Sequence, residues 1–246
     1  MSAALAISIV AVAAAYVWRW RGVTGSVSSR QMGAFLGGMV ALWIAVGSPL
    51  AHMDHAHLTG HMLQHLIIMT IAAPLILIGE PVLVLLGGDR LRRSWSVHPA
   101  LCWLAGTAVV IAWHVPALFD VGMRWHGLQH LTFLAGGLLF WVPVLRPWPT
   151  ISRWSRWTIP LYLFLATMPC DALSAFLAFC ERVIYPHYGS MHDHSAHHAA
   201  LADQARAGAL MWFWVTIAYL VPAAVVTVRL LSPSSRRSDT HARAPS

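Results

Sequence analysis

The sequence predicts an all-α protein, a polytopic bundle of about seven transmembrane helices with its N-terminus outside the cell and its C-terminus in the cytoplasm. Three observations predict this: the composition, the number of long apolar runs and the distribution of arginine. Of the 246 residues, 58% are hydrophobic and only 10% are charged. Because soluble domains carry about 25% charged residues, this composition is that of an integral membrane protein.

Seven apolar runs are each of a length suited to a helix that crosses a bilayer with some tilt. They cover residues 3–20, 32–50, 61–86, 100–117, 128–145, 158–180 and 208–231. The gaps between them are too short for a soluble domain, the longest being 181–207. We therefore expect one membrane domain, residues 1–231, followed by a disordered cytoplasmic tail, residues 232–246, that is rich in Ser, Arg and Pro.

Arginine predicts the orientation of this bundle. The chain has 16 Arg and no Lys, and 13 of the 16 fall in the first, third and fifth loops or after the last helix. The positive-inside rule places those segments in the cytoplasm. Only Arg124, Arg182 and Arg206 fall on the other side. Topology thus accounts for the net charge of +7, and no nucleic acid is expected as a partner.

Histidine follows the opposite distribution, since 13 of the 15 His fall at the outer ends of helices or in outer loops. Only His98 and His241 are expected on the cytoplasmic side. Neutral imidazole is the commonest protein ligand for Cu, Zn, Fe and Ni, and a thioether adds a preference for Cu(I). The outer face is therefore the expected location of a metal or cofactor site.

Two of the predicted helices begin with the same motif, H-x-x-Q-H, at His61–His65 and His126–His130. Histidines four residues apart lie on one face of a helix, about one turn from each other. Each pair is then followed by an apolar stretch that enters the membrane. We interpret the two pairs as ligands of a metal or a cofactor, although packing residues remain the alternative.

The other candidate ligands are more ambiguous when taken singly. A lone interfacial histidine such as His114 is more often a packing residue than a ligand. Asp171 is a functional candidate because a charge inside a span is costly, but it can also cap a helix turn broken near Pro169. The remaining candidates are Met62 and the outer-loop residues His52, His55, His57, His192 and His194, with His197 and His198 beside them. These loops could equally form a loose metal-capturing surface without fixed geometry.

An enzyme is not predicted. The chain has no nucleophile triad, phosphate loop, dinucleotide fingerprint or H-E-x-x-H motif. Its three cysteines, Cys102, Cys170 and Cys180, form no C-x-x-C pair and are odd in number, so neither a disulfide framework nor a thiolate metal cage is indicated.

Several motifs together resemble those of the CtaG-type cytochrome c oxidase assembly factors. They include Ser48-Pro49-Leu50, His61-Met62-x-Gln64-His65, Trp113-His114-x-Pro116, His126-x-x-x-His130 and Asp203-Gln204. The resemblance runs from about residue 33 to residue 231. It implies a multi-pass protein of the bacterial inner membrane that is needed to assemble an oxidase and helps to deliver copper to it. The expected partners are oxidase subunits, the copper ion and the lipid bilayer.

The mechanism we expect is ligand exchange. The outer His/Met loops collect copper, the two histidine pairs hold it, and a docked oxidase subunit takes it. Two other functions fit the same residues. One is a b-type haem electron carrier with His65 and His130 as axial ligands; the other is a copper importer.

Overall fold

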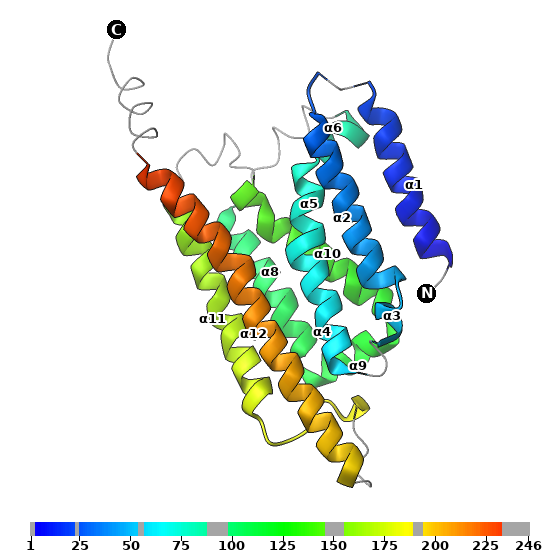
Figure 1. Ribbon diagram of the computed structural model, residues 1–246, viewed down its shortest axis with the longest axis vertical. Helices are drawn as coiled ribbons and strands as arrows, with labels where there is room; N and C mark the ends of the chain where they lie inside the picture. The colour runs from blue at the N-terminus through cyan, green and yellow to red at the C-terminus, as the bar shows by residue number, and fades with distance from the viewer. Residues whose placement is uncertain are drawn as a thin grey trace.

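The computed structural model describes residues 3–22, 25–53, 57–87, 98–145, 155–188 and 194–232, and these are mostly helical with no strand among them. A helix occupies each of the seven predicted segments, and successive segments run in alternating directions through one bundle (Figure 1). Five helices are individually long and apolar enough to cross a membrane, or six if a bent pair, Pro99–His114 with Pro116–Arg124, forms one span. The all-α multi-pass fold is therefore confirmed, while the predicted number of seven spans stays a prediction.

The elements follow one another in the order shown in Figure 1. They are α1 (Ala3–Trp20), α2 (Ser29–Gly47), α3 (Leu50–Met53), α4 (Leu58–Ile67), the π-helix η1 (Ile68–Ala72), α5 (Ala73–Ile78), α6 (Pro81–Leu86), α8 (Pro99–His114), α9 (Pro116–Arg124), α10 (His126–Leu145), α11 (Thr158–Phe179), the 3₁₀ turn η3 (Pro186–Tyr188) and α12 (His194–Leu231).

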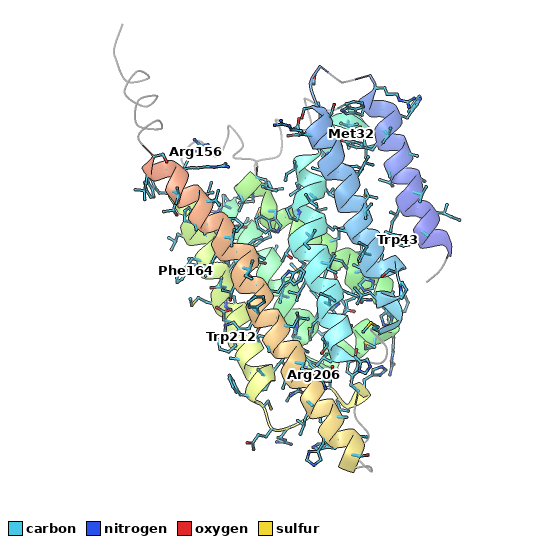
Figure 2. The ribbon with its side chains drawn as sticks, viewed as in Figure 1. Met32, Trp43, Arg156, Phe164, Arg206 and Trp212 are labelled. Carbon is cyan, nitrogen blue, oxygen red and sulfur yellow. The ribbon has the colours of Figure 1, made fainter. Side chains whose placement is uncertain are left out.

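The bundle has two chemically different ends. At one end α4 begins and α8 stops, so that His61, His114 and His126 lie close to it; we call this the histidine end. At the other, the arginine end, α1 and α12 stop and α11 begins. Figure 2 labels Arg156 at the arginine end and Arg206 at the histidine end. Arg19 and Arg229, in the last turns of α1 and α12, join Arg156 at the arginine end, as the sequence predicts for these residues. The side of the membrane that each end faces stays a prediction.

The rod formed by α4, η1 and α5 is the centre of the bundle. Its apolar window is 67% buried, whereas the corresponding windows of the other candidate spans are between 22% and 39% buried. Glycines let neighbouring helices approach it closely, as is common between membrane helices. A Cβ atom on Gly137 of α10 would lie 3.0 Å from Cβ of Ala73, and one on Gly38 of α2 would lie 2.8 Å from Cγ1 of Ile76. The histidine-bearing helix is consequently held from several sides.

The sequence predicts one span over 61–86, but the helix ends at Ile78 and a separate short helix, α6, covers Pro81–Leu86. Glu80 has a left-handed backbone, with φ of 53°. Pro81 follows it and starts the short helix α6. A residue before proline is disfavoured in the helical region, so the helix stops at this point. Tyr16 of α1 donates a hydrogen bond to the carbonyl of Gly79 and fixes the break.

A π-helical turn, η1, interrupts the same rod one turn after His65. Pro74 lies just beyond it, at the first turn of α5. A proline inside a helix clashes with the carbonyl four residues earlier, and a wider turn is one way in which a helix accommodates it. The indole of Trp141 donates to the carbonyl of Met69 within this turn at 2.9 Å. The turn is thus part of the packed core.

The last helix differs most from expectation. The sequence predicts a loop over 181–207, but α12 begins at His194. Residues 195–207 contain six alanines, the residue with the highest helix propensity, and polar side chains between them. The hydrophobic run used for the prediction therefore marks only the membrane-embedded part of α12. Its first turns project past α4 at the histidine end (Figure 1).

Candidate functional site

The site begins with the cap of α4. His57 is the N-cap residue and makes no side-chain capping bond. Asp203 of α12 takes that role: the backbone N–H of Leu58 donates to its Oδ2 at 2.6 Å, and the hydroxyl of Thr59 donates to its Oδ1 at 2.7 Å. A carboxylate at this position satisfies orphan N–H groups and complements the helix dipole. The start of α4, and with it the position of His61, is thereby fixed by α12.

Gln204, the next residue, fastens the loop after α11. Its Oε1 accepts from the backbone N–H of Ile184 at 2.8 Å, and its Nε2 donates to the carbonyl of Arg182 at 3.1 Å. From the same loop, the hydroxyl of Tyr185 donates to the carbonyl of His114 at 2.9 Å. The loop after α11 is therefore bonded both to α12 and to the last residue of α8.

His61 and His65 lie side by side inside this frame. Their side chains are 1% and 5% exposed, and their rings meet edge to face with centroids 4.1 Å apart. The ring of His65 also stacks on Phe133 at 3.9 Å. Within the described residues neither ring nitrogen of His65 has a hydrogen-bond partner. Because buried polar atoms are nearly always satisfied, His65 is the most conspicuous candidate ligand of the bundle.

The second histidine pair continues the row of rings. His130 and His126 are both half-buried in α10. The ring centroid of His130 lies 6.2 Å from that of His65, and the centroid of His126 lies 6.3 Å from that of His130. Two imidazoles that share one metal at about 2 Å from each ligating nitrogen have centroids at most about 6 Å apart. The separations of 6.2 Å and 6.3 Å are therefore close to the limit for two histidines on one ion.

The two copies of the H-x-x-Q-H motif are not equivalent. Gln64 lies between the helices, with its Oε1 3.3 Å from Nε2 of His130. Gln129 is fully buried, and neither atom of its amide has a hydrogen-bond partner among the described residues. It packs against the backbone of α9, where a Cβ atom on Gly122 would lie 2.6 Å from its Nε2. The two glutamines of the repeat therefore lie in different environments.

His114 and Met62 approach this cluster from α8 and α4. Nδ1 of His114 is 2.7 Å from the carbonyl of Val110, which can only accept, so Nδ1 carries the proton. In the neutral ring Nε2 then bears a lone pair. That lone pair lies 3.3 Å from the sulfur of Met62, which is also a lone-pair donor. The sequence predicts His114 as a candidate ligand with a packing residue as the alternative, and this geometry is compatible with the ligand role.

The other predicted site residues are less well defined. His57 is exposed at the start of α4, His52 belongs to α3 and His194 is the first residue of α12, whereas His55 and His192 lie outside the described residues. Asp171 is half-buried in α11, one residue from Cys170, and its Oδ1 has no hydrogen-bond partner in the part of the chain that the structure describes. Over the described ranges, no three His, Cys, Asp or Glu side chains form a ready-made metal site.

Sequence reasoning did not assign Asp203 and Gln204 any structural task, although both belong to the motifs that carry the family resemblance. Their signal was present only as polar residues in a segment expected to be a loop. Asp203 is 8% exposed and Gln204 is 2% exposed. These two side chains position the site without contacting its imidazoles directly.

Comparison with known proteins supports the resemblance. Residues 12–232 match the family model of the cytochrome c oxidase caa3 assembly factor (Caa3_CtaG). No curated protein matches the chain, and no solved structure does. The family match includes the five histidines of the cluster, the capping residue Asp203 and nearly all of the described helices. The chain therefore belongs to the family of cytochrome c oxidase caa3 assembly factors.

Proposed function

We propose that this oxidase assembly factor binds a copper ion in its buried histidine cluster and passes it to an oxidase subunit docked at the histidine end. The assembly role follows from the family, which also indicates a non-catalytic protein. The copper proposal is supported chiefly by His65, whose ring nitrogens are buried and unpartnered between His61 and His130. A metal ion would satisfy one of these nitrogens.

The row of rings supports transfer as well as binding. It runs from the buried His61 and His65 to the half-buried His130 and His126, in steps of 4.1 Å, 6.2 Å and 6.3 Å between centroids. Small movements of the imidazoles would let an ion exchange one ligand at a time along this row. The ion is cargo, so its binding has to be reversible, and a site with few ligands suits that requirement.

Two alternatives remain for the same histidines. A haem-binding role is disfavoured because the cavity beside His65 has a volume of only about 30 Å³. The imidazole of His65 is also packed between His61 and Phe133. A porphyrin between His65 and His130 would need these helices to separate. Copper import shares the site with copper delivery, and metal flux into proteoliposomes distinguishes the two functions.

The proposed setting is the bacterial inner membrane, with the histidine end on its outer side. The 13 arginines of the opposite segments support this orientation. The exposed His57 and the outer segments that carry His52, His55, His192 and His194 would then collect copper before it reaches the buried cluster. An oxidase subunit would dock on the same side, beside the projecting part of α12.

Metal analysis of the purified protein tests the proposal. Wild-type protein in detergent is loaded with copper, desalted and measured for bound metal, and it should retain about one equivalent. His65→Ala should lose it, whereas His98→Asn, which keeps a helix cap at the arginine end, should not. A visible spectrum excludes haem if no Soret band is present. Copper retention by His65→Ala, combined with its loss when His192, His194, His197 and His198 are all replaced, would assign binding to the start of α12 and the residues before it, and would end the cluster proposal.

A further inference from the structure

Beside His65 and His114 lies a small, partly open cavity of about 30 Å³, and four of the twelve residues that line it carry sulfur. Six of the surrounding residues can donate to a metal through nitrogen or sulfur: Met62, His65, Met69, His114, Cys170 and Met211. Each of these side chains is less than 10% exposed. They come from α4, η1, α8, α11 and α12, so elements far apart in the sequence have to pack together to form the cavity.

The central rod supplies half of these donors in one stripe. Met62, His65 and Met69 are spaced three and four residues apart, which places them on the same side of the rod. The π-helical turn starts at Ile68 and widens the rod beside Met69. Such turns occur frequently at functional sites. Met211 faces this stripe from α12 and Cys170 from α11.

The distance between Nε2 of His114 and Sδ of Met62 suits two atoms that bind the same ion. Nε2 and Sδ are 3.3 Å apart, each with a lone pair and neither with a hydrogen to donate in the neutral tautomer. An ion about 2.0 Å from the nitrogen and about 2.3 Å from the sulfur would subtend an angle of roughly 100° between them. That angle lies in the range of a trigonal or tetrahedral centre. A metal would thus turn a contact between two acceptors into two bonds.

The character of the cavity selects the oxidation state. Thioether and thiol donors favour the soft ion Cu(I) over Zn(II) or Cu(II). The side chains described around the cavity include no carboxylate, and burial of an ion in such a medium costs free energy that rises with the square of its charge. The volume of about 30 Å³ leaves little room for water around a bound ion, so the ion would shed most of its hydration shell. All three properties favour a monovalent, soft, dehydrated ion.

We infer that this cavity is a copper(I) site in which Nε2 of His114 and Sδ of Met62 are ligands and His65 links the site to the row of histidines. The inference rests on the proposed copper function and extends it, because it names the ion and a second, inner position for it. Copper enters and leaves as Cu(I) by ligand exchange, so no electron is transferred. The cavity would hold the ion away from oxidants between collection and delivery.

X-ray absorption at the copper edge tests the inference directly. Wild-type protein is loaded with Cu(I) in detergent under anaerobic, reducing conditions. The spectrum should be that of Cu(I), with at least one sulfur neighbour at about 2.3 Å together with nitrogen. A spectrum with nitrogen neighbours alone would overturn the sulfur site while leaving the proposed copper function intact. If no copper binds at all, the proposed function fails and the inference fails with it.

Competition with the Cu(I) chelator bicinchoninate supplies the second measurement. Met62→Leu keeps the volume of the side chain and removes its sulfur, so it should weaken Cu(I) binding at least about tenfold. The matched control is Met168→Leu in α11, where the methionine is 48% exposed and leaves the cavity unchanged. If Met62→Leu does not fold, His114→Gln, which removes the other inferred ligand, takes its place in the same titration. Equal Cu(I) affinity in the cavity variant and the control would contradict the inference.

Discussion

The carboxylate of Asp203 accepts a hydrogen bond from the backbone N–H of Leu58 at 2.6 Å, across 145 residues of chain. This bond connects the projecting part of α12 with the first turn of the helix that carries His61 and His65. Because a second bond joins Asp203 to the hydroxyl of Thr59, the carboxylate holds the helix start at two points. A movement of α12 at the histidine end would therefore be transmitted to the imidazoles.

The first prediction concerns this cap. Asp203→Ala should lower the free energy of unfolding by about 1–2 kcal/mol, the usual effect of removing an N-cap side chain, and should also weaken copper retention by loosening His61. Asp203→Asn keeps a hydrogen-bond acceptor, so its free energy of unfolding and its copper retention should fall less than those of Asp203→Ala. The measurements are unfolding in detergent and bound copper. Asp120→Ala, an exposed carboxylate at the same end of the bundle, is the control, and indistinguishable behaviour of the two alanine variants would show that the cap does not position the site.

The second prediction concerns the close approach of α10 to the π-helical turn. A Cβ atom on Gly137 would lie 3.1 Å from Cα and 3.2 Å from the carbonyl oxygen of Met69. Gly137→Ala should therefore destabilise the protein by about 1–3 kcal/mol through overpacking. Gly33→Ala is the control, since a Cβ atom there meets nothing within 4 Å. It should be neutral or slightly stabilising, and a thermal shift as large as that of Gly137→Ala would refute the packing argument.

The third prediction tests the orientation. In a variant without Cys102, Cys170 and Cys180, a cysteine at Ser195 in α12 should react with an impermeant maleimide in intact cells. A cysteine at Ser155, exposed at the arginine end, should react only after lysis. The reason is the placement of arginine on the cytoplasmic side. The reverse labelling pattern would put the histidine end in the cytoplasm and remove the proposed route of delivery.

Much of the fold could be predicted because a membrane makes hydrophobicity decisive. Each of the seven apolar runs became a helix, since a backbone in a bilayer has to satisfy its polar groups internally. The departures occur where something other than hydrophobicity acts. The left-handed Glu80 and Pro81 end the helix within a run that is apolar on both sides of Glu80. The start of α12 is polar, and its helix is visible only in its alanines.

The site was partly predictable for a related reason. The spacing of His61 and His65 determines that they share one helical face, so their proximity follows from the sequence. Their position relative to His130 and His114 depends on how three helices pack, which no local pattern encodes. The same holds for Met211, which lines the cavity from the opposite end of the chain. In contrast, the metal-collecting role of His55 and His192 stays a prediction, because both residues lie outside the described ranges.

The last prediction concerns the task of the protein in the cell. If the cluster supplies copper to a terminal oxidase, cells with His65→Ala should contain oxidase protein with haem but too little copper, and should respire poorly on that enzyme. Delivery changes how fast the oxidase acquires its metal, and the oxidase's own affinity for copper is unaltered. Excess copper in the medium should therefore restore part of the activity by mass action.

The experiment is a copper titration of the growth medium for the wild-type, His65→Ala and His98→Asn strains, with oxidase activity measured per haem. A haem-based electron carrier or a purely structural scaffold could not be bypassed in this way, because added metal replaces neither a redox centre nor a docking surface. His98→Asn should follow the wild type at every concentration. If activity in His65→Ala stays low at all non-toxic copper levels while its oxidase is fully metallated, copper supply is excluded, and the buried imidazoles must serve the assembly of the oxidase in another way.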